Sequence, residues 1–113
     1  MDSRQAILNL HLADALERYI VDIVLATRDP GRISDRIANA VHFGASPRAS
    51  IAIDRAARAH AWLAGRDYVG PEDIQTVAPD VLRHRVLLSF EAEADGLTPD
   101  DLVSEIIGGI GVP

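Results

Sequence analysis

The chain has 113 residues, no cysteine and a formal net charge of −6 at pH 7. A chain of this length forms one small domain that folds without cross-links, and the lack of cysteine excludes disulfides and thiolate zinc sites. All eleven basic residues are arginine, so the chain has neither a P-loop lysine nor a Schiff-base lysine. The acidic balance argues against nucleic acid as a partner, because phosphate contacts need a basic face.

No apolar run approaches the length of a membrane span, and no signal peptide opens the chain. We therefore expect a cytoplasmic protein without a membrane span. Residues 1–11 are assigned to an N-terminal linker, in which residues 3–10 form either a short helix or an extended segment. The first clear helix begins at Asp14 and ends at Asp29-Pro30-Gly31. Its apolar face comprises Leu16, Tyr19, Ile20, Ile23, Val24 and Thr27.

Residues 32–42 are either a short helix capped by Ser34 or an irregular connection. A long alanine-rich helix is predicted to follow Gly44, with Ser46 as the N-cap and Pro47 at the first helical position. Gly65 is predicted to end this helix as residue C′. Its predicted apolar stripe comprises Ala49, Ala52, Ile53, Ala56, His60 and Leu63.

The rest of the chain is also predicted to be helical, without any strand pattern. One helix begins at Gly70-Pro71, and Pro79 is expected to break it and to open another helix that runs to about Ser89. The last helix starts at Thr98-Pro99, and the glycines after residue 107 predict a flexible tail over 108–113. The predicted fold class is therefore all-α, a small bundle of four to five main helices over residues 12–107 with short connections.

No metal site is predicted, because the four histidines are scattered and none is paired with another at i, i+4. His60 is interpreted as a hydrogen-bonded core histidine. The acid pairs Glu72-Asp73 and Asp100-Asp101 are interpreted as first-turn carboxylates that stabilise a helix dipole. Arg83 and Arg85 are either a surface pair or a docking contact to another domain or subunit.

Arg48 has an unusual place for a cation. It projects from the first turn of a helix, where the positive end of the helix dipole already lies. An arginine there is either simply solvated or directed at an anion.

The segment Gly44-Ala45-Ser46-Pro47-Arg48-Ala49 resembles the sensor-2 motif of the MoxR family of AAA+ ATPases. Further segments resemble the helical lid domain of that family, so that the resemblance covers roughly residues 12–96. They follow in the expected order: Arg55-Ala56-Ala57-Arg58-Ala59, Gly65-Arg66-Asp67-Tyr68-Val69, Pro71-Glu72-Asp73-Ile74 and Ala78-Pro79-Asp80-Val81-Leu82-Arg83-His84-Arg85. Gly70 departs from the usual Thr or Ser, which should weaken capping by only about a few tenths of a kcal/mol.

The resemblance implies a lid that closes over ATP and Mg²⁺ held by a preceding AAA+ core domain. It implies that Arg48 is the catalytic and nucleotide-binding residue, because a sensor-2 arginine reaches the γ-phosphate. It also implies a ring oligomer, an unknown client protein, and chaperone-like remodelling or metal-cofactor insertion. The Walker A and Walker B segments belong to the preceding domain, so the chain alone is expected to lack ATPase activity and to hold no cofactor.

Two other interpretations stay open at this point. The chain is alternatively a stand-alone helical interaction module, or a small DNA-binding domain built on the helix–link–helix rhythm of residues 67–85. A lid separated from its core domain should expose apolar side chains near Ser46 and near the N-terminal segment.

Overall fold

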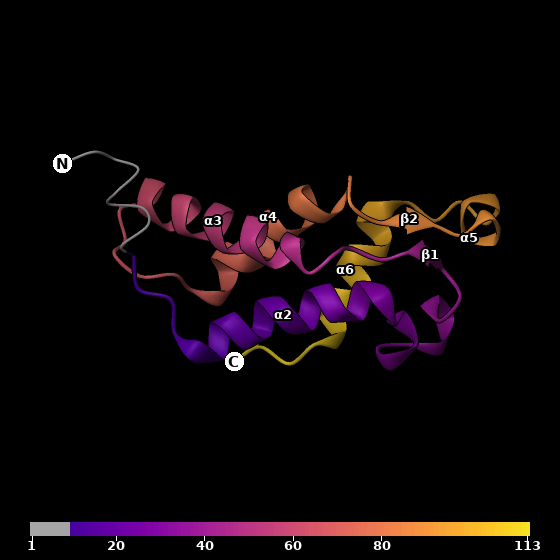
Figure 1. Cartoon of the computed structure of the whole chain (residues 1–113), viewed down its shortest axis with the longest axis horizontal. Helices are drawn as coiled ribbons and strands as arrows, with labels where there is room; N and C mark the ends of the chain where they lie inside the picture. Colours follow the sequence, from indigo (N-terminus) through magenta and orange to yellow (C-terminus); the bar gives the residue numbers. More distant parts are fainter. Residues whose placement is uncertain (1–9) are drawn as a thin grey trace.

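The structure, a computed structural model, describes residues 10–113. Most of residues 3–10, for which the sequence leaves both a short helix and an extended segment open, and most of the linker expected over residues 1–11 lie outside the described residues. The described part contains five α-helices, two 3₁₀ turns and a two-stranded sheet, which confirms the predicted, mostly helical bundle (Figure 1). In chain order these are α2 (Asp14–Arg28), η1 (Pro30–Arg32), η2 (Asp35–Ile37), β1 (Val41–Phe43), α3 (Arg48–Leu63), α4 (Pro71–Leu82), β2 (Leu87–Leu88), α5 (Phe90–Ala94) and α6 (Pro99–Gly109).

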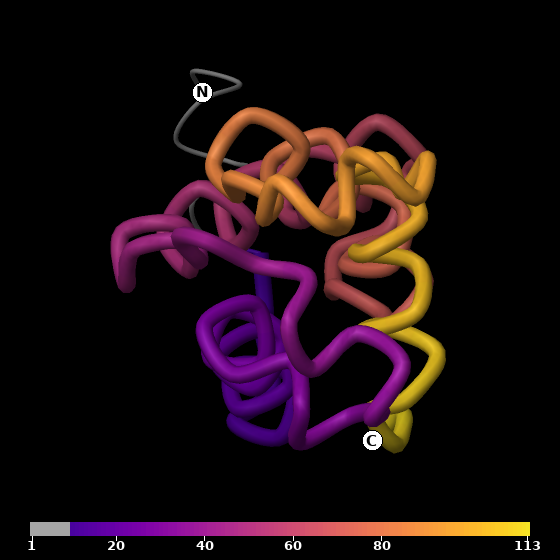
Figure 2. Tube along the Cα trace, turned by 90° about the vertical axis from the view of Figure 1, so that its right-hand side faces the viewer, coloured from indigo at the N-terminus to yellow at the C-terminus, as the bar shows by residue number. Residues whose placement is uncertain are grey.

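The four longer helices enclose the core. Helix α2 contacts α3 and α6, and α4 contacts the same two helices. Figure 2 shows α2 (indigo) nearly end on and α6 (yellow) running from top to bottom on the opposite side, so that α6 crosses the long direction that α2 and α3 share in Figure 1. Helix α2 has the predicted bounds, and every residue of its predicted apolar face is buried. None of the described helices is both long and apolar enough to cross a membrane.

The expectation of an entirely strand-free chain is wrong. Residues 41–43 pair antiparallel with residues 87–88, with Val41 opposite Leu88 and Phe43 opposite Leu87. The bond from Ser89 N to Ala40 O (2.8 Å) closes the end of this pair. Segments of two or three residues are too short to show strand periodicity, so only the tertiary contact could reveal them. The ambiguous stretch before β1 forms two 3₁₀ turns, and Ser34 caps the second, accepting a bond from Arg36 N.

The prediction that Pro79 breaks a helix is also wrong. Helix α4 continues through Pro79 to Leu82, and residues 87–94 form β2 and α5 in place of a continuous helix. A proline within a helix has a compatible φ but removes one backbone hydrogen bond, at a cost of about 3 kcal/mol. Ala78 and Leu82, on either side of it, are both fully buried. Their packing holds this turn of α4 against the core in spite of that cost.

The predicted apolar stripe of α3 is only partly right: Ala49 and Ile53 are buried as predicted, but the rest of the stripe is not. The buried row has strict i, i+4 spacing, whereas Leu63 is 78% exposed and His60 only partly buried. Alanines lie all round this helix, so the sequence pattern does not fix which face is buried. The predicted C′ residue is confirmed: Gly65 has φ +80°, and Arg66 N donates to Ala61 O (3.0 Å) beyond it. The buried row comprises Ala49, Ile53, Ala57 and Ala61.

Helix α6 begins with the predicted cap and ends later than predicted. Thr98 and Asp101 form a reciprocal capping box, with both side-chain-to-backbone distances at 3.1 Å. The helix continues through Gly108 and Gly109, which were expected to belong to the tail. Backbone hydrogen bonds carry the helix through these two glycines despite their poor helix propensity.

Candidate functional site

Arg48 lies at the first position of α3, in the first turn as predicted. Pro47 precedes it with helical angles (φ −56°, ψ −23°), and no side chain caps the helix, so the predicted hydroxyl cap by Ser46 is not formed. The backbone makes the turn instead, because Ser46 O accepts from Ala49 N at 2.9 Å and Pro47 O accepts from Ser50 N at 3.1 Å. The tip of α3 is thus shaped by main-chain bonds.

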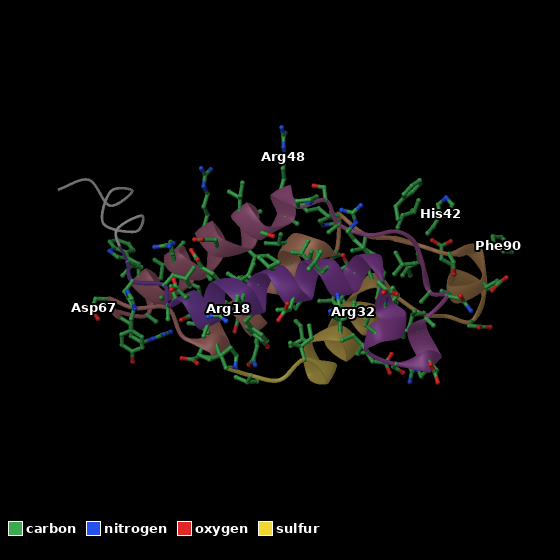
Figure 3. The ribbon with its side chains drawn as sticks, turned by 60° about the horizontal axis from the view of Figure 1, so that its bottom comes forward. Arg18, Arg32, His42, Arg48, Asp67 and Phe90 are labelled. Carbon is green, nitrogen blue, oxygen red and sulfur yellow. The ribbon has the colours of Figure 1, made fainter. Side chains whose placement is uncertain are left out.

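The Arg48 side chain is exposed and stands clear of the ribbon (Figure 3). It makes no hydrogen bond or ion pair with any residue of the described range 10–113. The first turn of α3 contains no acidic residue. The dipole of α3 and an unpaired guanidinium therefore present positive charge in the same place, which suits an anion such as a phosphate group.

The junction before α3 is held against the last turn of α2. Thr27 is fully buried, and its hydroxyl donates to Val24 O (2.6 Å) and accepts from Ala45 N (3.0 Å). Gly44 lies so close to α2 that a Cβ there would come within 2.6 Å of Thr27 O and of the Arg28 Cα. A glycine is needed at this position because the contact is with backbone, which does not move aside. This contact holds the segment that leads into α3 against α2.

Replacing Gly44 with alanine is expected to destabilise the domain by about 1–3 kcal/mol, the usual cost of forcing extra volume into a packed contact. Urea unfolding of the purified domain measures this loss. Gly108→Ala is the matched control, because a Cβ on Gly108 meets nothing within 4 Å and alanine favours a helix by up to about 1 kcal/mol. Equal stability of the Gly44→Ala variant and the unchanged domain would contradict the close contact.

Exposed apolar side chains lie in both regions for which the sequence predicts them. Phe43 and Ile51, on either side of Ser46 in sequence, are 65% and 55% exposed. At the other end of α3, Leu63 is exposed, and so is Tyr68, which forms a β-bridge with His11 in the N-terminal part of the described chain. Large apolar side chains are thus exposed near both ends of α3.

A second polar centre joins the end of α3 to the start of α4. Asp73 is fully buried and binds both amino groups of Arg66 at 2.6 Å, while its Oδ2 accepts from Gly70 N at 2.8 Å. His60 Nδ1 lies 2.5 Å from Asp73 Oδ1. His60 is thus hydrogen-bonded as predicted, although it is partly exposed and not a core residue.

The sequence correctly predicts Asp73 in a first turn, but it does not show that this carboxylate is buried and shared by three donors. The only local signal is its third position after the Gly70 N-cap, the acidic position of a capping box. Because glycine has no side chain, only the Asp73 half of that box exists. His60 lies in the last turn of α3 and Arg66 follows the end of that helix. The sequence could therefore not show that these two residues approach Asp73.

Burial disfavours the charged form of Asp73, but the hydrogen bonds from Arg66, Gly70 N and His60 outweigh it and lower the pKa of this carboxyl to about 2. An unfolded aspartate has a pKa of about 3.9. A group whose pKa is lower in the folded state stabilises the fold above the unfolded pKa, and this contribution is lost as the pH falls through the folded pKa.

We therefore expect the free energy of unfolding to fall by about 2 kcal/mol on account of Asp73 as the pH is lowered from about 4 to about 2. Urea unfolding of the domain and of its Asp73→Asn variant across this range separates this carboxyl from the others. The stability difference between the two proteins should shrink as the pH falls. A difference that stays constant down to pH 2 would contradict the assignment.

The remaining charged residues singled out in the sequence have structural roles. Arg83 bridges α4 to α6 through Asp100 (2.8 Å) and also pairs with Asp80 (3.2 Å). Arg85 is exposed and donates to Val81 O at 3.1 Å. Within residues 10–113, no three His, Asp or Glu side chains gather in a metal-binding arrangement.

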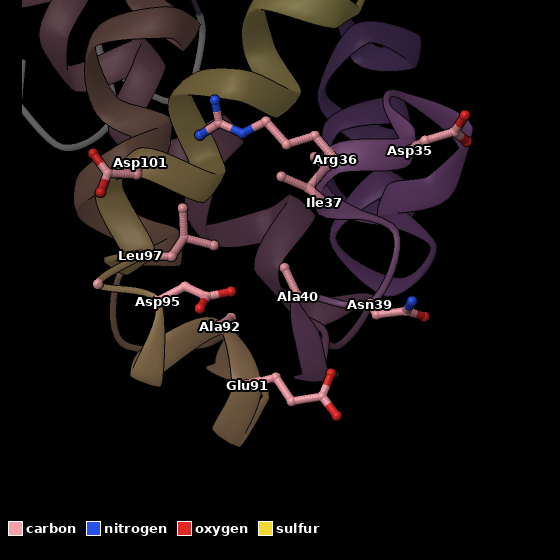
Figure 4. Close-up of a pocket in the computed structure, with 11 residues that line it drawn as sticks. Asp35, Arg36, Ile37, Asn39, Ala40, Glu91, Ala92, Asp95, Leu97 and Asp101 are labelled. Carbon is pink, nitrogen blue, oxygen red and sulfur yellow. The ribbon is translucent and has the colours of Figure 1, made fainter.

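An open cavity of about 480 Å³ lies between η2, α5 and the start of α6. Figure 4 shows Glu91, Ala92 and Asp95 on the α5 side of the cavity and Arg36 and Ile37 on the other side. Asp101, which also lines it, is occupied by the capping box of α6. Four of the eleven residues that line the cavity are carboxylates and only one is an arginine, so the cavity does not suit a phosphate ligand.

The fold and the site define a small helical lid domain that presents, at the tip of its longest helix, an arginine without a bonded partner among residues 10–113. The family model described as the AAA lid domain matches residues 33–106. Chaperone MoxR1 of Mycobacterium tuberculosis is 44% identical over 100 residues, which are 88% of this chain and 26% of that protein. Protein MoxR of Paracoccus denitrificans is 36% identical over 110 residues, with 91% and 32% of the two chains covered.

A solved structure agrees with these relatives. The crystal structure of a candidate ATPase from Cytophaga hutchinsonii superposes with a TM-score of 0.91 at 38% identity, covering 96% of this chain and 33% of that one. The chain belongs to the AAA lid domain family, and it is a lid region of the MoxR type of AAA+ ATPase. It spans about a quarter to a third of the length of these relatives.

Proposed function

We propose that this chain is the sensor-2 lid of a MoxR-type AAA+ ATPase, which closes over ATP and Mg²⁺ held by a preceding core domain. The observation that carries the proposal is Arg48, exposed and without a partner in the described chain, at the positive end of α3. A guanidinium in this position forms charge-assisted bonds to phosphate oxygens. It favours ATP over ADP when those oxygens belong to the γ-phosphate.

The rest of the domain would then transmit the nucleotide state. Helix α3, which begins at Arg48, packs into one core with α2, α4 and α6. The lid can therefore rotate as a unit when its contact with the phosphate is lost. The bound magnesium ion would neutralise phosphate charge during hydrolysis. Arg48 binds and orients the phosphate, whereas Walker residues of the core domain would hold the ion.

The biological setting proposed for the full protein follows its relatives. One relative is named a chaperone and two are named MoxR proteins. We accordingly infer a cytoplasmic ATPase that assembles as a ring and remodels a client protein or assists metal-cofactor insertion. The exposed apolar residues Phe43, Ile51 and Leu63 would be covered by the core domain or by a neighbouring subunit.

ATP hydrolysis by the full-length protein and by its Arg48→Ala variant tests the proposal. Both proteins must be folded and assembled alike, which circular dichroism and light scattering check. Reduced hydrolysis by the variant supports the lid function. Unchanged hydrolysis and nucleotide affinity would overturn it and leave Arg48 as an ordinary surface residue.

A further inference from the structure

We propose that Thr27 is a positioning residue for Arg48, acting through the backbone that leads into α3. This inference rests on the proposed sensor-2 function, and it concerns a residue outside the sensor-2 segment. Thr27 lies in the last turn of α2, 21 positions before Arg48 in the sequence. In the structure, the Thr27 hydroxyl is hydrogen-bonded to Ala45, which lies only three residues before Arg48.

The hydroxyl of Thr27 forms a two-sided bridge. It donates to Val24 O at 2.6 Å, and this bond orients the oxygen so that it accepts from Ala45 N at 3.0 Å. Both Thr27 and Ala45 are fully buried. Water is therefore excluded from this amide, and no other acceptor is bonded to it in the described chain.

The chain between the bridge and Arg48 has little freedom. Only Ser46 and Pro47 separate Ala45 from Arg48, and the proline ring fixes one of the remaining φ angles. On the other side of Arg48, Ala49 is again fully buried. The Arg48 Cα is thus held between two buried anchors, so a shift of Ala45 moves the base of the arginine side chain.

Within residues 10–113, no other side chain is hydrogen-bonded to the backbone that leads into this tip. Helix α3 has no side-chain N-cap, and Ser46 contributes only its backbone carbonyl to the first turn. In many helices a cap hydroxyl fixes the direction of the first turn. Here the nearest bond to a side chain is the one that the Thr27 hydroxyl accepts from Ala45 N, one residue before Ser46, whose carbonyl opens the first turn. Since misplacing a catalytic group by about 1 Å can cost about 100-fold in rate, this bond sets how well Arg48 meets a phosphate.

A double-mutant cycle in the full-length ATPase tests the inference. Thr27→Val keeps the shape of the side chain and removes the hydroxyl, whereas Thr27→Ser keeps the hydroxyl. We expect Thr27→Val to lower ATP turnover about tenfold or more, and Thr27→Ser to keep most of it. In a protein that already carries Arg48→Ala, Thr27→Val should lower turnover no further, because the two residues act as one unit.

Ile106→Val is the matched control, since Ile106 is fully buried in α6, a different helix. This substitution also weakens the core, but its effect on turnover should be small and the same with and without Arg48. If Thr27→Val fails to fold, Thr27→Ala takes its place in the cycle. Alanine also lacks the hydroxyl, and it has no γ-methyl group that would press against the Ala45 amide.

The outcomes separate this inference from the proposed function. If Arg48→Ala lowers turnover but Thr27→Val does not, the positioning role is overturned and the sensor-2 function stands. If Thr27→Val lowers turnover equally with and without Arg48, its effect is structural and the positioning role is again overturned. If Arg48→Ala itself has no effect, the proposed function fails, and the inference fails with it.

Discussion

Replacing Arg48 with alanine in the full-length ATPase is expected to lower the turnover number about 100-fold or more, the usual loss when a preorganised cationic contact to a reacting phosphate is removed. The stability of the lid should stay within about 0.5 kcal/mol, because Arg48 is exposed and has no bonded partner in the described part of the chain. Steady-state ATP hydrolysis and thermal unfolding of the same preparations measure the two effects.

Two further variants make this result specific. Arg48→Lys keeps the charge but loses the planar fork that binds two phosphate oxygens, so its turnover should fall between those of the alanine variant and the unchanged protein. Arg55 lies two turns further along α3, is also exposed, and forms no ion pair within residues 10–113. Arg55→Ala should therefore leave turnover nearly unchanged. Equal losses for Arg48→Ala and Arg55→Ala would point to a general electrostatic effect in place of a defined phosphate contact.

Replacing Asp73 with asparagine is expected to cause the largest loss of stability, about 3 kcal/mol or more, because it leaves a guanidinium without its buried counter-ion. Asp73 joins Arg66 to the Gly70 backbone and to His60, so the change loosens the link between α3 and α4. For a domain of this size, such a loss lowers the melting temperature by more than about 10 °C. Thermal and urea unfolding of the domain near pH 7 measure it.

The control for Asp73 is its neighbour Glu72. Both carboxylates lie in the first turn of α4. The Glu72 side chain, however, is 63% exposed, and its carboxylate lies 3.4 Å from the Arg66 guanidinium, which is a long distance for such a contact. An exposed pair of this kind contributes at most about 1 kcal/mol. Glu72→Gln should therefore cost little. A similar melting temperature for the Asp73→Asn and Glu72→Gln variants would contradict the central role of the buried carboxylate.

The short-range features of this fold could be predicted from the sequence. The limits of α2 follow from its apolar spacing and from Asp29-Pro30-Gly31, the C-terminal end of α3 follows from Gly65, and the start of α6 follows from Thr98. The exposed place of Arg48 in a first turn could also be predicted, because Pro47 fixes where a helix can begin. Each of these features depends on residues within a few positions of one another.

Features that join distant segments could not be predicted. Residues 41–43 become a strand only because residues 87–88 pair with them, and Pro79 stays inside α4 only because Ala78 and Leu82 are buried. The alanines of α3 leave its buried face undecided until α4 packs against it. In each case the energy of packing exceeds the local preference.

The sequence by itself determined the helical class of this protein, the limits of α2, the C-terminal end of α3, the N-terminal cap of α6, and the exposed arginine of a sensor-2-like segment. Only the tertiary structure decided that Asp73 is buried among three donors and that the Thr27 hydroxyl holds Ala45 in front of Arg48. The physical reason is distance along the chain: caps and turns are formed by neighbours. The Thr27 bond, in contrast, spans 18 residues, and the His60–Asp73 contact spans 13. Such contacts form only when the core brings separate helices together, and their strength comes from the exclusion of water there.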